Sequence, residues 1–333
     1  MPQHVQAGQL PRQARIAAVG GYRPRRVVGN EEICRHVDST DQWIRRRTGI
    51  ETRHVAEPDE TLEVMAAAAA DKALAEAGVD PSQVGVVIAA TMSYLYQAPP
   101  LAARAGALLD GFRGAAFDVS GACAGFCHAL ELARVLVASG SADHVVVVGA
   151  ERMSDIVDPT DRSTAFLFGD GAGAVVVAPS RETRIFPPEW GSDPSGADAI
   201  AQPDPWDCGP ARPEPANRYL GMHGQEVFRW VTDSVPAVAE GALARAGMSV
   251  QDLAAFVPHQ ANLRITETLV RRLGLPPEVR VARDVVRTGN TSAASIPLAL
   301  ESLLAQGEMS GRPALLLGFG SGLGHCAQTV LLP

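Results

Sequence analysis

A cysteine, a histidine and an asparagine in this sequence each follow a short apolar run and a turn. Cys123 stands in FDVSGACAGF, His259 in FVPHQAN and Asn290 in TGNTSAAS. A strand predicted to end at residue 119 leads through small residues into a helix predicted to begin near Cys123. Free backbone N–H groups and the positive end of the helix dipole favour thiolate over thiol at such a point. The pattern therefore predicts a nucleophilic sulfur at Cys123.

Each of these residues also has a purely structural interpretation. A lone cysteine is often a small core hydrophobe, and a histidine or asparagine beside a turn can cap the next helix. From the turn alone the two interpretations of Cys123 are evenly balanced, and for His259 and Asn290 the structural one is favoured. Ligands bind at the carboxyl ends of parallel strands. Three such side chains at three strand-to-helix turns together predict one shared pocket.

Two further segments have residue types suited to binding. The turn at residues 319–322, Phe-Gly-Ser-Gly, follows an apolar run and could present backbone N–H groups as an oxyanion hole, although a plain hairpin turn is the alternative. Trp43 with the arginines at 45–47 could stack on an adenine ring and hold phosphates. Arg264, on a predicted helix just past His259, could dock an acidic partner. The alternative for both basic groups is a solvated charged face.

The elements that must position these residues alternate between apolar strands and Ala-rich helices. Strands are predicted at residues 15–19, 84–91, 115–119, 144–149, 174–178, 254–257, 314–318 and 328–332. Helices are predicted at residues 61–77, 102–109, 124–138, 224–246, 263–273 and 292–305. Continuous apolar strands separated by helices indicate an α/β fold with a mostly parallel sheet covered on both faces. A turn, a helix and a strand ending in glycine recur in both halves, which suggests a duplicated unit.

The length of 333 residues suggests two domain-sized units. We expect residues 1–13 to form a loose N-terminal tail and residues 14–180 to form a first half with the nucleophilic cysteine. Residues 181–218 are rich in Pro, Gly and Asp and are predicted to be a connecting loop. Residues 219–333 are predicted to form a second half that carries the histidine and the asparagine.

Composition excludes several classes of protein. A net charge of −8 disfavours a nucleic-acid binder, and no run of 18 apolar residues predicts a membrane span. The polar N-terminus does not read as a signal peptide. Five sparse cysteines predict free thiols in a reducing, cytoplasmic compartment. Cys123, Cys127 and His128 lack a second ligand pair nearby, so we expect no metal site there.

The longer motifs decide the family. The stretches DSTDQWIRRRTGIETR, AFDVSGACAGF, DPTDRSTAFLFGDGAGAVVV, GQEVFRW, VPHQANLRI and GNTSAASIPLALESLL run from about residue 15 to the C-terminus. In this combination the sequence resembles the β-ketoacyl-acyl-carrier-protein synthase III family of thiolase-fold condensing enzymes. It is especially similar to actinobacterial members, including those that prime aromatic polyketide pathways. The resemblance implies a thiolase-like fold of duplicated βαβαβ halves in a five-layered α/β sandwich, and a homodimer.

The resemblance also implies a two-step condensation. Cys123 would take the acyl group of an acyl-CoA, after which malonyl-acyl-carrier protein would enter. His259 and Asn290 would hydrogen-bond the malonyl thioester oxygen while CO₂ is lost, and the carbanion would attack the acyl-cysteine to give a 3-ketoacyl-carrier protein. The backbone N–H groups of Cys123 and Ser321 would form the oxyanion hole. Such a reaction starts fatty-acid or aromatic polyketide synthesis and implies no metal or redox cofactor.

Binding roles come from the same resemblance. Trp43 and Arg162 would hold the CoA adenine between them, and the other implied CoA contacts are Ser39, Arg47 and Asn262. Arg264 would dock the acyl carrier protein. Ala98 would reach into the acyl pocket of the neighbouring subunit, and its small side chain predicts room for longer or branched primers. The sequence departs from the family at Gly324-His325-Cys326 and over residues 187–216, which affects the substrate expected rather than the three central residues.

Three other functions have some support. A cysteine hydrolase also uses Cys, His and Asn in this order, but the flank of Cys123 and the duplicated pattern do not fit one. A non-catalytic partner, like those that set polyketide chain length, conflicts with the intact Cys123. An acyltransferase that passes the acyl group to an alcohol or amine without condensation is the alternative to the main interpretation. Relatives of that kind often alter His259 or Asn290, and both are present here.

Overall fold

Two five-stranded sheets with the same strand order form the framework. A computed structural model describes residues 12–205 and 217–333, and the first sheet has the order β1 (Gln13–Tyr22), β7 (Gly171–Ser180), β6 (His144–Glu151), β4 (Val84–Ala90), β5 (Ala115–Val119). The second has the order β8 (Glu189–Ser192), β14 (Gly324–Leu331), β13 (Pro313–Gly320), β11 (Ala255–Pro258), β12 (Arg280–Val281). The last three strands of each order are parallel and the first two are antiparallel to their neighbours. The duplication is therefore confirmed, whereas the expectation of mostly parallel sheets was wrong because each sheet is mixed.

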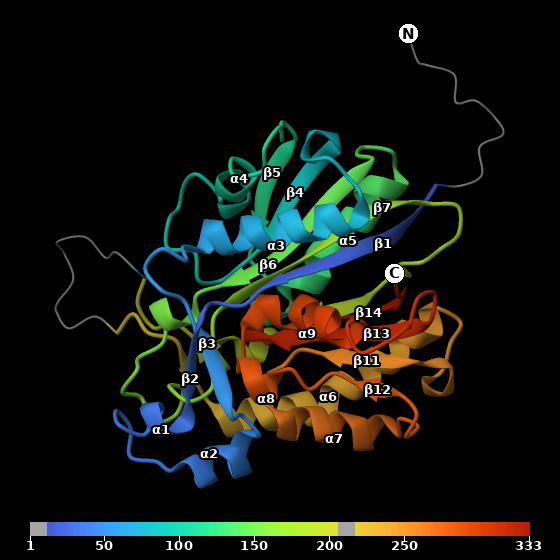
Figure 1. Cartoon of the computed structure of the whole chain (residues 1–333). Helices are drawn as coiled ribbons and strands as arrows, with labels where there is room; N and C mark the ends of the chain where they lie inside the picture. The colour runs from blue at the N-terminus through green and yellow to red at the C-terminus, as the bar shows by residue number, and fades with distance from the viewer. Residues whose placement is uncertain (1–11, 206–216) are drawn as a thin grey trace.

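Helices and sheets alternate in five layers (Figure 1). Helices α3 (Leu62–Ala77) and α4 (Leu101–Gly106) cover the outer face of the first sheet. Helices α5 (Gly125–Ala138) and α9 (Ser295–Leu304) lie between the sheets, and α6 (Gly224–Arg245) and α7 (Leu263–Leu273) cover the second sheet from outside. This is the thiolase-like sandwich that the resemblance implied.

The apolar strands are buried on both faces. Along β6, Val145 and Val147 belong to the core between the sheets, whereas Val146 and Val148 pack against α3. Successive side chains of a strand point to opposite faces. An unbroken run of valines therefore serves two layers at once, and each fully buried valine stabilises the fold by roughly 1.5–3 kcal/mol.

Smaller elements form the rest of the described chain. The hairpin β2 (Arg26–Gly29) and β3 (Thr52–Val55) carries α1 (Asn30–Ile33) and α2 (Asp41–Thr48) between its strands. Helix α8 (Val285–Thr288) precedes the asparagine turn, and β9 (Ile200–Ala201) pairs with β10 (Gly221–Met222). In the parts of the chain that the structure describes, no helix is long and apolar enough to cross a membrane.

Two predicted boundaries need correction. Gln13, expected in the tail, pairs with Ser180 as the first residue of β1, while residues 1–11 lie outside the described part. The segment 181–218 is not only a connection, because β8 within it is the edge strand of the second sheet. That strand has four residues, of which three are exposed, so no apolar alternation marked it. Residues 206–216, including Cys208, fall outside the described residues.

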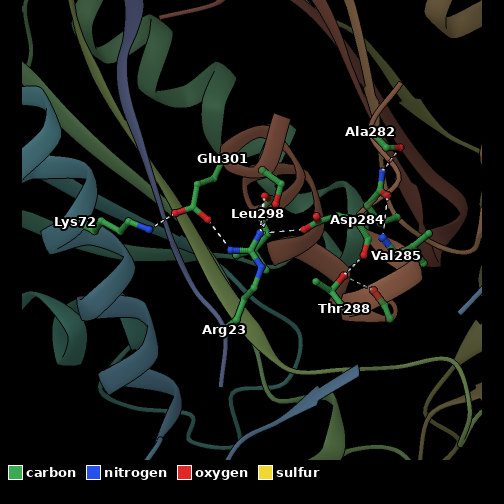
Figure 2. Close-up of polar contacts among 11 residues, drawn as sticks. Arg23, Lys72, Ala282, Asp284, Val285, Thr288, Leu298 and Glu301 are labelled. Carbon is green, nitrogen blue, oxygen red and sulfur yellow. Dashed lines mark hydrogen bonds and ion pairs between the residues drawn. The ribbon is translucent and has the colours of Figure 1, made fainter. Parts of the chain in front are cut away.

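A network of ion pairs joins the two halves (Figure 2). Arg23, just after β1, contacts Glu301 of α9 at 2.5 Å and Asp284 at 3.0 Å. Its guanidinium also donates to the carbonyl of Leu298 at 3.0 Å. Lys72 of α3 contacts the second oxygen of Glu301. Glu301 therefore connects two elements of the first half to a helix of the second.

Candidate active site

The three central residues of the prediction line one cavity of about 730 Å³. Cys123 comes from the turn after β5, His259 from the end of β11, and Asn290 from the turn after α8. Phe319 and Gly320, at the end of β13, line the same cavity. The shared pocket that the sequence predicted is therefore present.

Cys123 is a buried thiol rather than the expected thiolate. It lies in a short 3₁₀ turn, Ala122–Ala124, and α5 begins two residues later at Gly125. Burial raises the pKa of Cys123 to about 12, and a hydrogen bond to Ser292 opposes that shift only in part. The expectation from the helix start was wrong because loss of hydration disfavours the charged form by more than the helix end favours it.

His259 is held as a neutral ring. Its side chain is 2% exposed, and burial lowers its pKa to about 3. The Nδ1 atom lies 2.7 Å from the hydroxyl oxygen of Ser295, which itself accepts from the backbone N–H of Gln260 at 3.3 Å. This leaves the Ser295 hydrogen free to donate to Nδ1, which favours the tautomer with the proton on Nε2. The edge of the ring packs on Phe319, with centroids 5.2 Å apart.

Asn290 is oriented by the backbone around it. Its Oδ1 accepts from the backbone N–H of Ser292 at 2.8 Å, so the Nδ2 group is the end of the amide that can donate elsewhere. Its own backbone N–H donates to the carbonyl of Leu167 at 2.8 Å. The preceding Gly289 has φ +64°, a conformation that glycine adopts without strain.

The glycine turn between β13 and β14 presses against the cysteine. A Cβ on Gly320 would lie 2.8 Å from the Cβ of Cys123 and 3.1 Å from its sulfur. The next residue, Ser321, lines the cavity and anchors the turn by donating its hydroxyl to the carbonyl of Ile200 at 2.6 Å. The backbones of Ser321 and Cys123 thus lie beside one another.

The cavity mouth is aromatic and basic. The Arg162 guanidinium lies 5.7 Å from the Trp43 ring centroid, and Trp43 meets Phe166 edge-on at 5.3 Å. Arginines 47, 229 and 264 line the same cavity, and its described lining contains no Asp or Glu. Asn262 also lines it and caps α7 by accepting from the backbone N–H of Ile265 at 3.0 Å.

Two of the predicted site residues lie elsewhere. Ser39 is not part of the cavity lining, and its buried hydroxyl has no hydrogen-bond partner among the described residues. Ala98, which precedes a cis proline, also lies outside the lining formed by this chain. His128 packs edge-on against Trp190 at 5.9 Å, and no cluster of metal-ligating side chains occurs in residues 12–205 and 217–333.

Known proteins match along nearly the whole chain. The family model for 3-oxoacyl-[acyl-carrier-protein (ACP)] synthase III matches residues 117–194, and its C-terminal counterpart matches residues 243–332. Beta-ketoacyl-[acyl-carrier-protein] synthase III 1 of Streptomyces coelicolor is 50% identical, with 96% of each chain covered. The chain belongs to the 3-oxoacyl-ACP synthase III family. The mycobacterial member of Mycobacterium marinum is 44% identical, covering 96% of this chain and 95% of that protein.

Solved structures of family members agree with the fold. The priming β-ketosynthase from the R1128 polyketide biosynthetic pathway superposes with a TM-score of 0.95 at 48% identity, covering 98% of this chain and 99% of that one. The synthase III from Aquifex aeolicus gives a TM-score of 0.88 at 36% identity, covering 96% and 99%.

Sequence reasoning missed three residues of this synthase III site. Arg229 lines the mouth, Ser292 contacts the sulfur of Cys123, and Glu151 is a fully buried carboxylate at the end of β6. Glu151 had a visible signal, since a charged residue closes the apolar run HVVVVGAE at the same sheet edge as the cysteine turn. Ser292 looked like an ordinary small residue of the asparagine turn.

Proposed function

We propose that this synthase III family member condenses an acyl-CoA primer with malonyl-acyl-carrier protein, with loss of CO₂, through an acyl group on Cys123. The observation that carries the proposal is the meeting of a buried thiol with two uncharged donors, His259 and Asn290, in one cavity. The product is a 3-ketoacyl-carrier protein, the first intermediate of a fatty-acid or polyketide chain.

The geometry suits a carbanion. Loss of CO₂ from a malonyl thioester places negative charge on the thioester oxygen, and preorganised donors aimed at that oxygen lower the barrier. The Nε2–H of neutral His259 and the Nδ2–H of Asn290 supply two such donors. The backbone N–H groups of Cys123 and Ser321 form the oxyanion hole of the acyl transfer. Because decarboxylation itself generates the nucleophile, the reaction needs no metal or redox cofactor.

The mouth of the cavity receives CoA. Trp43 and Arg162 hold the adenine, and Arg47 and Asn262 contact the rest of the cofactor-sized substrate, with Ser39 beside them. This assignment is supported by the stacked Trp43–Arg162 pair and by a lining without acidic groups. Arg264, whose guanidinium lies 5.8 Å from the Phe228 ring centroid, docks the acidic carrier protein at the same mouth.

A homodimer in the cytoplasm completes the proposal. Strand β5 is the edge of the first sheet, and its Phe117 is 37% exposed, so a second copy could extend the sheet there. Ala98 would then reach the acyl pocket of the partner and leave room for primers longer or more branched than acetyl. Free thiols at the four described cysteines fit a reducing compartment.

A two-step experiment tests the function. The protein is incubated with acetyl-, isobutyryl- or hexanoyl-CoA, and the acyl group is located on Cys123 by intact mass and peptide mapping. Malonyl-acyl-carrier protein is then added. Release of CO₂ with a 3-ketoacyl product supports condensation, whereas transfer to an added alcohol or amine without CO₂ supports the alternative acyltransferase. A strong preference for acetyl-CoA in kcat/KM would contradict the role given to Ala98.

A further inference from the structure

The thiol of Cys123 already points at a hydroxyl. Its sulfur donates to the Oγ of Ser292 at 3.4 Å, and Ser292 is fully buried. Ser292 has φ +46°, a left-handed conformation that favours glycine and is uncommon for serine. Such backbones persist at functional sites when the surroundings hold them. The strained turn therefore keeps a hydroxyl against the reacting sulfur.

Behind Ser292 lies a carboxylate without a cation. Glu151 accepts hydrogen bonds from the backbone N–H groups of Met92, Ser93 and Ala293 at 3.1 to 3.3 Å. None of the salt bridges among the described residues includes Glu151. Burial raises the pKa of Glu151 to about 7, and hydrogen bonds, one of them from Ser292, oppose that shift. A buried carboxylate with only neutral neighbours takes up a proton readily.

The duplicated fold explains why this carboxylate lies so close to the cysteine. Glu151 ends β6 as Gly320 ends the equivalent strand β13. The turn Ser292–Ala294 before α9 corresponds to the turn Ala122–Ala124 before α5, and both begin with a positive φ. Ala293 is thus the counterpart of Cys123. The equivalent place holds a proton-accepting group in one half and a glycine beside the substrate in the other.

We propose that Ser292 and Glu151 form the path by which Cys123 loses and regains its proton. Ser292 is the catalytic hydroxyl because it touches the reacting sulfur, and Glu151 is a positioning residue that acts through it. This inference rests on the proposed acyl transfer to Cys123.

The proton balance of both steps is complete. As the sulfur attacks the acyl-CoA thioester, its proton moves to the Oγ of Ser292 while the Ser292 proton moves to Glu151. The electron pair left on sulfur forms the new C–S bond, and CoA leaves as a thiolate that takes its proton from water. When the carbanion breaks the acyl–Cys123 bond, the proton on Glu151 returns through Ser292 to the released thiolate.

The test compares two neighbouring buried hydroxyls in the full-length protein. Ser292→Ala removes the hydroxyl that contacts the sulfur, whereas Thr291→Val removes one that has no hydrogen-bond partner among the described residues. We expect Ser292→Ala to slow formation of the acetyl-enzyme at pH 7 by at least about tenfold, in kcat rather than in KM for acetyl-CoA. Alkylation of Cys123 by iodoacetamide, followed by peptide mapping, should shift to higher pH in Ser292→Ala and stay unchanged in Thr291→Val.

Glu151 is tested by coupling. Glu151→Gln should slow acylation and shift the alkylation profile in the same direction. The double variant with Ser292→Ala should be no slower than the slower single variant, because both act on one path. Ser292→Gly, which also relieves the backbone strain, should behave like Ser292→Ala. If Glu151→Gln does not fold, judged by its thermal unfolding, the comparison of Ser292 with Thr291 decides alone.

Two results would overturn the path. One is acylation at the wild-type rate with an unchanged alkylation profile in Ser292→Ala and Ser292→Gly, and the other is additive losses in the double variant. Absence of any acyl-Cys123 in the wild-type protein would instead contradict the proposed function. The alkylation profiles need no substrate, so they test the proton path even in that case.

Discussion

At the scale of single residues, burial sets the charges of the site. His259 loses its water and gains one hydroxyl partner, Ser295, which is too little to stabilise an imidazolium. The ring is therefore neutral throughout the range in which an enzyme of this family would work. This ionisation state gives the protein a measurable dependence of stability on pH.

We expect the folded state to lose stability as the pH falls below about 6.5. The unfolded chain protonates His259 near 6.5, whereas the folded chain does so only near 3. Between these values the unfolded state binds more protons and is favoured by acid, at up to about 1.4 kcal/mol per pH unit. Urea unfolding of wild type and His259→Gln at pH 7.5, 6 and 5 measures the difference. His36→Asn, at an exposed histidine, should follow wild type; parallel curves for all three proteins would refute the assignment.

A second residue-scale prediction concerns the stacked pair at the mouth. Replacing Arg162 by Ala should raise KM for acyl-CoA about tenfold with little change in kcat, because the lost contacts bind the nucleotide and not the reacting thioester. Steady-state kinetics with acyl-CoA and with the truncated acyl-pantetheine measure this. Only the full substrate should respond. Arg181→Ala, at an exposed arginine outside the cavity lining, provides the control.

At the scale of elements, the β13–β14 hairpin acts as a wall against the cysteine turn. Gly320 has an extended backbone, φ 174°, that any residue could adopt, so the need for glycine comes from space alone. A methyl group here would push the hairpin away from Cys123. The oxyanion donors would then separate although each remains in place on its own element.

Gly320→Ala should therefore lower acyl transfer by about 100-fold while the protein stays folded, since small displacements of reacting groups cost that much. Intact-mass kinetics of acyl-Cys123 formation, with circular dichroism for the fold, would show it. Gly29→Ala is the matched control, because a Cβ there meets nothing within 4 Å. Equal rates for the two variants would mean that the hairpin does not constrain the site.

The element scale also shows how far the sequence carried. Strand β5 and helix α7 lie within the predicted residues because their apolar periods are regular. Strand β8 escaped detection because an exposed four-residue edge strand has no apolar pattern of its own. The meeting of Cys123, His259 and Asn290 was predictable from their places at strand ends. The ionisation of Cys123 was not, because it depends on layers packed over the turn by residues far away in the chain.

At the scale of the whole molecule, the network around Arg23 joins the halves. Its guanidinium and its two acidic partners are each at most 25% exposed. Arg23→Leu should lower the free energy of unfolding by about 2 kcal/mol, because Glu301 and Asp284 lose their partner away from water. Arg25→Leu, which breaks an exposed pair with Asp59, should cost less than about 1 kcal/mol. Urea unfolding ranks the two, and an equal loss would show that the network contributes no more than a surface ion pair.

Lys72 is the only lysine of the sequence, and its ammonium contacts Glu301 within that network. Amine-directed reagents therefore have one side chain to find, and it lies on the joint between the two halves. Acetic anhydride would remove a single charge from Glu301, whereas reductive methylation would keep the charge and add only bulk. Covalent chemistry alone can thus separate electrostatics from packing at this joint, without any change to the gene.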